Sequence, residues 1–305
     1  MRSFKYGLVL MLLAFLRPVP SVAEVKDILF VRHGQSSFNQ MMEHKRGLQK
    51  LKSLTFSRNK IKDANLTQTG IVEALRLRSH LLDAVDSEDE TIQFIAKSLL
   101  EPRDDVLVLA SNLRRAVNTG LLVLYGDDRD HEAPKNGHDV VYPVYISSLL
   151  QEWGVPQAVP DVQPFSKNFF EQGQLINEPI ESSLGSFADD LHKYLHIYPD
   201  DSEISVDGRL RSGTGNTKPL KDKYAAFLQS IVFNDSDVEG LDVASKKVFV
   251  VFGHGRWLKG FVNFIKEPDD PKMGIVSNAS LTHMKVEKQE DGSFHLLSRE
   301  CYRSL

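Results

Sequence analysis

The sequence predicts a three-layer α/β/α sandwich with a mostly parallel central sheet. The first observation is that short apolar runs, typical of strands buried on both faces, alternate with segments whose apolar residues recur at helical spacing. The second is that polar, glycine-containing triplets follow two of these runs directly, as expected where loops gather at the carboxyl edge of a parallel sheet. The chain has 305 residues, 41% of them hydrophobic, which suits either one large domain or two small ones.

The first strand is expected at residues 28–31, an unbroken apolar run that ends in Arg32-His33-Gly34. A helix is expected to begin near Thr67, because a threonine hydroxyl can cap the first turn of a helix. Apolar residues follow at about helical spacing at Ile71, Leu75, Leu82 and Val85.

A second buried strand is expected at residues 106–110, and either Ser111 or Asn112 can cap a helix after it. The apolar face of that helix includes Leu113, Val117, Leu121 and Leu124. A third strand is expected at 140–146, where Pro143 indicates a sheet edge or an irregularity, since proline cannot donate a ladder hydrogen bond.

The later part of the chain continues the alternation. A helix is expected at about 221–233 and a strand at 248–252, and this strand ends in Gly253-His254-Gly255. Residues 281–286 and 294–297 are expected to be closing strands. Strands that alternate with helices in this way indicate a parallel sheet.

Residues 155–220 interrupt the pattern. They are rich in Pro, Asp, Ser and Gly and show little periodicity. We interpret them as an insertion or lid over the site, because long irregular segments in compact domains usually carry function.

Residues 1–23 have the features of a secretory signal peptide. Arg2 and Lys5 form a basic start, Leu8 to Leu16 form an apolar run, and Ser21-Val22-Ala23 offers small residues for cleavage after Ala23. The run is too short to cross a bilayer, which takes about 20 residues. The alternative is a buried N-terminal helix or strand, which is disfavoured because a complete strand-like run follows at once. We therefore expect export and secretion, and no stable membrane span.

Composition excludes some partners and some kinds of cross-link. The formal net charge of −4 favours no nucleic-acid partner. Cys301 is the only cysteine, so no intrachain disulfide can form.

Four segments carry residue types suited to catalysis. They are Arg32 to Ser36 with Asn39 close behind, Ser111 to Ala116 with Thr119 one turn on, Leu150 to Gly154, and Gly253 to Gly255. Each is weak alone, because an Arg-His-Gly triplet is common by chance and a lone histidine is more often structural. Their occurrence together, with three directly after apolar runs, indicates a site at the carboxyl edge of the sheet.

Each of these residues also has a structural interpretation. Arg32 and Arg115 could be ion-pair partners, and Glu152 could be a solvated loop carboxylate. Asn39 and Ser111 could be turn or cap residues.

With these motifs in place, the sequence resembles the histidine phosphatase superfamily, in its phosphoglycerate mutase-like branch with the Arg-His-Gly motif. Arg-His-Gly at 32–34, the serine-to-alanine segment at 111–116, the acidic Glu152 and His254-Gly255 follow the family order. The resemblance implies a single histidine phosphatase domain over 24–305, with insertions at about 40–62 and 155–220.

The resemblance also implies roles for individual residues. His33 is the expected nucleophile, Arg32 and Arg115 the expected phosphate clamps, and His254 a further donor. Glu152 is the expected general acid. The substrate-binding set comprises Arg32, Gly34, Asn39, Arg115, His254 and Gly255. Arg115 is preferred over Arg114 because it immediately precedes the alanine.

The chemistry suits these residue types, because arginine offers a planar fork of donors to phosphate oxygens and stays charged. We expect a phosphatase that hydrolyses phosphomonoesters through a phosphohistidine on His33, with a small phosphorylated molecule as substrate. No step needs a metal or another cofactor. The oligomeric state is left open.

Three departures from the family leave alternatives open. Gly255 stands where the acid phosphatase branch carries an aspartate, which assigns the acid role to Glu152. Residues 40–62 contain several basic residues that form either a solvated loop or a rim for polyanions. The region after Gly154 does not match mutase segments. The alternatives are a phosphoglycerate mutase-type phosphotransferase, an isomerase, and a catalytically impaired phosphate-binding or interaction protein.

Overall fold

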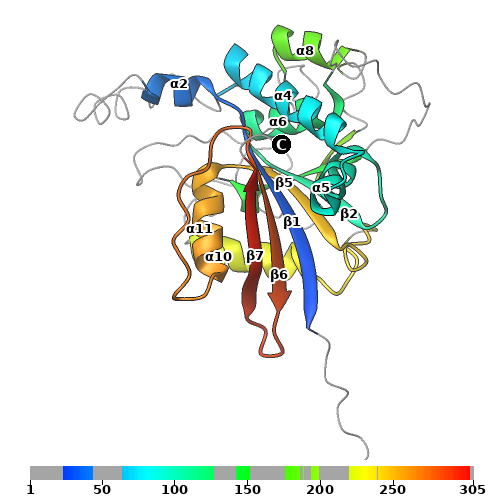
Figure 1. Ribbon diagram of the computed structural model, residues 1–305, viewed down its shortest axis with the longest axis vertical. Helices are drawn as coiled ribbons and strands as arrows, with labels where there is room; N and C mark the ends of the chain where they lie inside the picture. Colours follow the sequence, from blue (N-terminus) through cyan, green and yellow to red (C-terminus); the bar gives the residue numbers. More distant parts are fainter. Residues whose placement is uncertain are drawn as a thin grey trace, which may run out of the picture.

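A computed structural model describes residues 23–43, 64–126, 142–151, 176–185, 188, 194–198, 220–238 and 240–302 of the chain (Figure 1). The predicted signal peptide lies outside these ranges, and so do most of the residues of the two predicted insertions. Among the described residues, no helix is long and apolar enough to cross a membrane.

One seven-stranded sheet, in the order β4-β3-β2-β5-β1-β6-β7, forms the centre of the molecule. Its strands are β1 (Glu24–Arg32), β2 (Val106–Ser111), β3 (Val144–Ser147), β4 (Leu195–Ile197), β5 (Val248–Gly253), β6 (Leu281–Lys288) and β7 (Phe294–Tyr302). The pairs among β4, β3, β2, β5 and β1 are parallel, whereas β6 pairs antiparallel with both β1 and β7. The predicted α/β class and the mostly parallel sheet are therefore confirmed.

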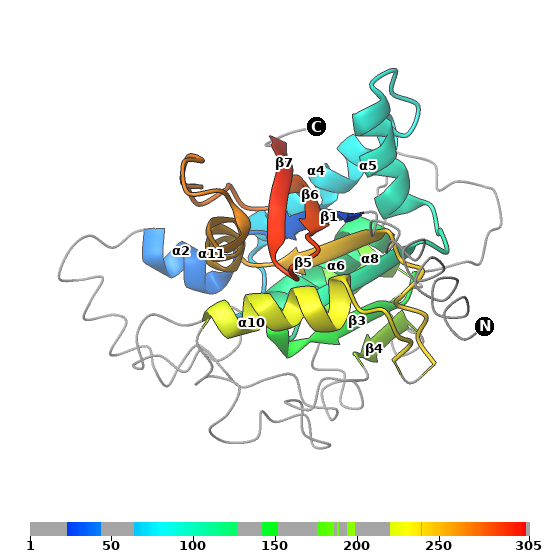
Figure 2. The same cartoon turned by 90° about the horizontal axis from the view of Figure 1, so that it is seen from below.

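Helices cover both faces of this sheet. They are α2 (Ser37–Glu43), α4 (Gln68–Ala84), α5 (Glu90–Leu100), α6 (Arg114–Tyr125), the short 3-10 helix η2 (Ser148–Leu150), α8 (Glu178–Leu184), α10 (Leu220–Phe227), the π-helical segment η4 (Leu228–Val232) and α11 (Gly255–Ile265). Figure 2 shows α10 and α5 on opposite sides of the strands.

Side-chain alternation along β1 divides the apolar interior into two layers. Leu29 and Val31 pack with α4, α5, α6 and α8, whereas Ile28 and Phe30 pack with α10, η4 and α11. Successive side chains of a strand point to opposite faces, so an unbroken apolar run serves both layers. This is the three-layer arrangement that the apolar strands predicted.

Trp257 fixes α11 and η2 against the sheet beside the carboxyl edge. Its ring stacks on Phe30 and Phe261, with centroids 5.6 and 4.9 Å apart. Its indole Nε1 donates to the backbone oxygen of Leu149 at 2.9 Å. A buried tryptophan needs such a partner for its N–H group, and here the bond ties the segment after β3 to the helix after β5.

Several predicted elements agree in kind and differ in detail. Thr67 caps α4 as expected, because its side chain accepts from Gly70 N. The buried face of α4 is Ile71, Ala74, Leu77, Leu81 and Ala84, so the predicted Leu82 and Val85 lie beside that face and are half-buried. Ala74 and Ala84 complete the buried face of α4, which the prediction had based on large apolar residues alone.

The prediction about the cap of α6 was wrong. Neither Ser111 nor Asn112 caps α6, whose N-cap is Leu113 without a side-chain cap hydrogen bond. Part of the 155–220 segment belongs to the core, since α8 buries Ile180 and Leu184 and β4 pairs with β3. Short elements of this length carry too few residues to show periodicity.

Helices α5 and α11 were also not predicted.

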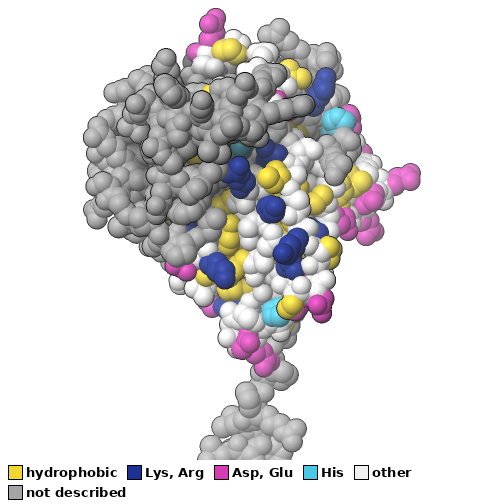
Figure 3. All heavy atoms as spheres, turned by 90° about the vertical axis from the view of Figure 1, so that its left-hand side faces the viewer, with side chains coloured by type: hydrophobic (Ala, Val, Ile, Leu, Met, Phe, Trp, Pro, Cys, Tyr) yellow, Lys and Arg dark blue, Asp and Glu magenta, His cyan; other side chains and the backbone are white. Residues whose placement is uncertain are grey.

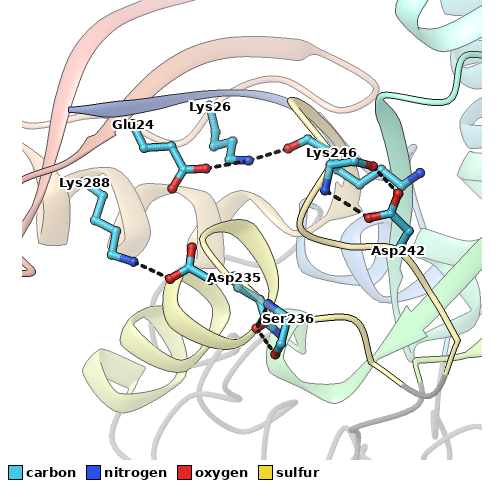
Figure 4. A network of polar contacts seen from close by, with 9 residues as sticks. Glu24, Lys26, Asp235, Ser236, Asp242, Lys246 and Lys288 are labelled. Atoms are coloured by element: carbon cyan, nitrogen blue, oxygen red, sulfur yellow. Dashed lines mark hydrogen bonds and ion pairs between the residues drawn. The ribbon is translucent and has the colours of Figure 1, made fainter. Parts of the chain in front are cut away.

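A polar network closes the amino edge of the parallel strands (Figure 4). The buried ammonium of Lys26 donates to Lys246 O at 2.5 Å and pairs with Glu24 at 2.7 Å. Lys288, at the end of β6, pairs with Asp235 at 3.4 Å. These contacts connect strand ends to neighbouring segments, so we assign the polar residues of this edge a structural role.

Two cavities, of about 380 and 250 Å³, lie at the same amino edge. The larger is lined in part by Lys288 and Asn234, and the smaller by Val106 and Lys246. Neither includes a residue that the sequence marks for catalysis. The chemistry-bearing residues gather at the opposite, carboxyl edge.

Candidate active site

Four of the five parallel strands, β1, β2, β3 and β5, carry the predicted site segments at their carboxyl ends, which lie at one edge of the sheet. Their register pairs Arg32 with Gly253 and Ser111 with Ser147. The residues that follow these strands therefore converge, although Arg32 and Gly253 are more than 200 positions apart in the sequence. The structure brings His33, Arg115 and His254 close together.

His33 is held by contacts on three sides. Its backbone N–H donates to Gly253 O at 2.9 Å, and its ring Nδ1 lies 2.7 Å from Gly34 O. A carbonyl oxygen only accepts, so Nδ1 carries the proton. The other ring nitrogen, Nε2, accepts from Arg115 Nε at 3.3 Å. The imidazole is therefore the neutral tautomer with its lone pair on Nε2.

The surroundings keep His33 neutral. The ring is 2% exposed, and burial lowers its pKa well below the usual value. The positive charges of Arg115 and then Arg32 lower the pKa further, while the bond to Gly34 opposes them. A neutral imidazole is the form that can act as a nucleophile.

His254 faces His33 across the cluster, with ring centroids 5.1 Å apart in an edge-on arrangement. Its Nε2 lies 2.8 Å from Ser111 Oγ. Burial, then Arg115 and His33, lower the pKa of His254 well below its ordinary value. Ser111 opens the second of the four predicted segments and also had an interpretation as a cap or turn residue, but its contact with His254 could not be read from the sequence.

Arg32 and Arg115 provide the positive charge of the cluster. Arg115 is 2% exposed in the first turn of α6. Arg32 ends β1, and its Nη1 donates to Val276 O. Two guanidinium groups beside neutral histidines offer several N–H donors to an anion, which is the composition that phosphate recognition requires.

Two helices begin at the cluster. α6 begins at Arg114 and α11 begins at Gly255, and both lack a side-chain hydrogen bond at the N-cap. The first-turn N–H groups and the positive end of the helix dipole favour an anion at such a position. Backbone and side-chain charge therefore act in the same direction.

Asn39 has a capping role in the structure. Its Oδ1 accepts from Ser36 Oγ at 2.6 Å and from Ser36 N at 3.3 Å, and its own N–H bonds to Ser36 Oγ. These reciprocal bonds cap α2. The structural interpretation accounts for the oxygen of Asn39, and its place in the substrate-binding set stays a prediction.

Asn112 and Gln151 form a buried amide contact that no sequence pattern signalled. Asn112 Nδ2 donates to Gln151 Oε1 at 3.3 Å, and both side chains are almost fully buried. The contact joins the ends of β2 and the β3–η2 segment directly before residue 152. Glu152, the predicted acid, lies outside the described residues together with Trp153.

Gly255 allows Arg32 to lie against the β5–α11 turn. A Cβ at this position would meet Arg32 Nε at 2.9 Å and Arg32 Cδ at 3.0 Å. Real Cβ atoms do not approach so closely, so any side chain here, an aspartate included, displaces Arg32. The glycine is therefore part of the clamp's geometry.

We expect Gly255→Ala to lower kcat/KM on a phosphorylated substrate by roughly 10- to 100-fold, because a shift of the clamp spoils alignment. Steady-state kinetics check this. Gly274→Ala is the matched control, since a Cβ there meets nothing within 4 Å. Equal activity of the two variants would show that the placement of Arg32 does not depend on glycine at position 255.

Metal-binding side chains do not cluster at this site. Within the described ranges, no three His, Cys, Asp or Glu side chains lie close enough together to hold a metal ion.

Fold and site together define an α/β protein with two buried, neutral histidines, a buried arginine and a half-buried arginine at the carboxyl edge of its parallel strands. No protein-family model and no curated protein matches the chain. Solved structures similar to it include a mycobacterial glucosyl-3-phosphoglycerate phosphatase, 14% identical, covering 92% of this chain and 99% of that one, at a TM-score of 0.42.

Two further solved structures are similar to the chain. A phosphoglycerate mutase from Bacillus anthracis str. Sterne is 16% identical, with 90% of this chain and 93% of that one covered, at a TM-score of 0.42. A phosphoserine phosphatase from Entamoeba histolytica, in complex with 3-phosphoglyceric acid, is 16% identical, with coverage of 92% and 99% and a TM-score of 0.40. The fold class rests on this chain's own strand pairing, and its chemistry on its own side chains.

Proposed function

We propose that the protein is a phosphatase that hydrolyses phosphomonoesters through a phosphohistidine on His33. The observation that carries the proposal is the state of His33. It is buried and neutral, with Nδ1 anchored on Gly34 O and Nε2 directed at the Arg115 guanidinium. A phosphoryl group bound by that guanidinium lies beside Nε2, the unprotonated ring nitrogen, and takes over the Arg115 N–H that Nε2 accepts in the structure.

The first step transfers the phosphoryl group to the protein. His33 Nε2 attacks phosphorus, an N–P bond forms, and the ester P–O bond breaks with its electron pair on the leaving oxygen. Arg32, Arg115 and the first turns of α6 and α11 stabilise the charge on the equatorial oxygens, which is the main requirement of phosphoryl transfer.

The second step releases inorganic phosphate. Water attacks the phosphohistidine, the N–P bond breaks, and its electron pair returns to Nε2. Arginine, histidine and backbone donors supply the electrostatic stabilisation in both steps, so the proposed mechanism needs no metal.

We assign the proton transfers to Glu152, on the family resemblance of its segment. It would protonate the leaving oxygen and then accept a proton from water. Glu152→Gln should slow substrates with poor leaving groups more than an activated aryl phosphate, because a good leaving group needs no acid. Equal losses on both substrates would place the acid elsewhere.

The test of the proposed function is a search for the covalent intermediate. The mature chain is mixed with an activated aryl phosphate in the presence of a chelator, and phosphate release is measured. The protein is then quenched in alkali and mapped for a phosphorylated peptide. We expect that hydrolysis continues in the presence of the chelator and that the phosphorylated peptide is the one that contains His33.

The other outcomes separate the alternatives. Phosphoenzyme that hands its group back to a phosphoglycerate, with little phosphate release, would indicate the mutase-type isomerase. Phosphate binding without any phosphoenzyme would indicate a catalytically impaired binding protein. Either result would overturn the phosphatase proposal.

We also propose that the chain is exported, on its N-terminal basic, apolar and small-residue pattern. N-terminal sequencing of the protein from the medium of expressing cells should show a start at Glu24. A start at Met1, or retention in the cell, would contradict export with cleavage.

A further inference from the structure

Thr119 links the nucleophile loop to the helix that carries Arg115. It lies in α6, one turn after Arg115, and its side chain is fully buried. Its Oγ1 accepts from Gly34 N at 3.0 Å and donates to Arg115 O at 2.7 Å. The first of these bonds joins residues 85 positions apart.

A bond from a helical threonine to the carbonyl four residues earlier is common and says little alone. The bond from Gly34 is different, because it comes from another element and lies inside the candidate site. Three successive N–H groups of this loop have three different partners. His33 N donates to Gly253 O, Gly34 N to Thr119 Oγ1, and Gln35 N to Glu73 Oε2 at 2.6 Å.

These contacts close into a ring of hydrogen bonds. Arg115 O accepts from the Thr119 hydroxyl, and the hydroxyl oxygen accepts from Gly34 N. Gly34 O then accepts from His33 Nδ1, and His33 Nε2 accepts from Arg115 Nε. The ring begins and ends on Arg115, so it connects the nucleophile and the clamp in one closed path.

Gly34 has no room to change its position alone. A Cβ on Gly34 would lie 2.4 Å from Gly70 O, so the loop is packed directly on the first turn of α4. On the other side it is held by Thr119. Thr119 therefore fixes the His33–Gly34 peptide, while Glu73, through Gln35 N, fixes the next peptide, whose Gly34 carbonyl accepts from His33 Nδ1.

We propose that Thr119 is a positioning residue for His33, which acts through Gly34 to hold the Nδ1–H tautomer and to aim Nε2. This inference rests on the proposed function, in which Nε2 attacks phosphorus. Loss of the hydroxyl leaves Gly34 N–H unpaired in a buried place, which is unfavourable enough to rotate the loop. Its carbonyl then no longer selects one tautomer.

The experiment compares three variants of the full chain. Thr119→Val removes the hydroxyl and keeps the branched shape, and Thr119→Ser keeps the hydroxyl. Thr282→Val is the matched control, because Thr282 is equally buried and its hydroxyl donates to Cys301 Sγ, at 3.6 Å, on the neighbouring strand β7. Thermal unfolding of all three shows what the loss of a buried hydroxyl does to stability alone.

Two measurements are made on each variant. Single-turnover phosphorylation of His33 by an aryl phosphate gives the rate of the first step. Nitrogen-15 NMR of the histidine rings shows which nitrogen of His33 carries the proton, and it does not depend on turnover.

We expect Thr119→Val to lower the phosphorylation rate by about 10- to 100-fold with little change in KM, as misplacement of a reacting atom does. The His33 ring should lose its single Nδ1–H tautomer. Thr119→Ser should restore both readouts, and Thr282→Val should match wild type in both.

Two results would overturn the proposal. One is a Thr119→Val protein with the wild-type rate and tautomer. The other is equal loss in Thr119→Val and Thr119→Ser, which would make the residue structural only. A wild-type protein that forms no phosphohistidine refutes the proposed function instead. In that case a tautomer change confined to Thr119→Val still supports the positioning role.

Discussion

His33→Ala should lower phosphatase turnover by about 10⁴-fold or more, the scale of loss when a nucleophile is removed. The physical reason is that His33 Nε2 supplies the electron pair that attacks phosphorus. The ring is oriented by two hydrogen bonds, from Nδ1 to Gly34 O and from Arg115 Nε to Nε2. Without it the bound ester has only water as its attacking group. Steady-state hydrolysis of an aryl phosphate, with phosphoenzyme trapping, measures the loss.

A second buried histidine is the control for this change. His283 lies in β6, is 6% exposed, and its Nε2 contacts Asp27 at 2.6 Å, away from the cluster. His283→Gln should keep turnover near wild type even where it lowers the unfolding midpoint. Substantial turnover in folded His33→Ala protein would remove His33 as the nucleophile.

Arg115→Gln is the second change with a large expected effect. We expect kcat/KM to fall by about 10²- to 10³-fold, the usual result of removing one preorganised donor from a site where charge develops. The neighbouring Arg114→Gln is the matched control, because Arg115 rather than Arg114 is 2% exposed and bonded to His33. Comparable losses in both variants would contradict the assignment of the clamp.

The same variant should change the pH dependence. The charge of Arg115 lowers the pKa of both His33 and His254, so its removal raises both pKa values. A histidine with a raised pKa takes up its proton at a higher pH, and a protonated His33 cannot attack. Wild-type activity should therefore persist as the pH falls below about 6.5, the ordinary histidine value, whereas Arg115→Gln should lose activity at a higher pH. Rate profiles of the phosphorylation step from pH 5 to 8 check the sign.

The surface around α11 carries charged side chains of both signs. Figure 3 shows Lys and Arg side chains spread over the face that includes α11, and Arg256 and Lys259 are exposed on this helix. Acidic residues follow the helix directly, at Glu267, Asp269 and Asp270. The positive charge that the proposal needs at the site itself comes from half-buried Arg32 and buried Arg115.

Some features of the molecule could be predicted because they depend on local pattern. The apolar runs of β1, β2 and β5 are strands buried on both faces, and an unbroken run suffices to indicate such a strand. Thr67 caps α4 because capping depends on one residue and the turn after it. His33 and His254 each follow a parallel strand, so strand direction placed both at the carboxyl edge, and the pairing of β1 with β5 brings them together.

Other features depend on contacts between distant segments, and no local pattern signals them. β4 has three residues and exists because β3 offers it a partner. Asn112 and Gln151 meet only because β2 and β3 are neighbours. The requirement for glycine at 255 comes from the Arg32 side chain, more than 200 residues earlier in the chain.

The amino-acid sequence thus specified the class of fold and the types of residue at the carboxyl edge, because strand burial, caps and strand ends are short-range properties. The tertiary structure specified their chemical state. The neutral tautomer of His33 and the ring through Thr119 require a carbonyl, the Arg115 guanidinium and a hydroxyl from separate elements to lie within hydrogen-bond distance, and burial with the charges of Arg115 and Arg32 lowers the pKa of His33. Burial makes each of these contacts stronger than it would be in water, and burial is created only when the whole sheet and both helix layers assemble.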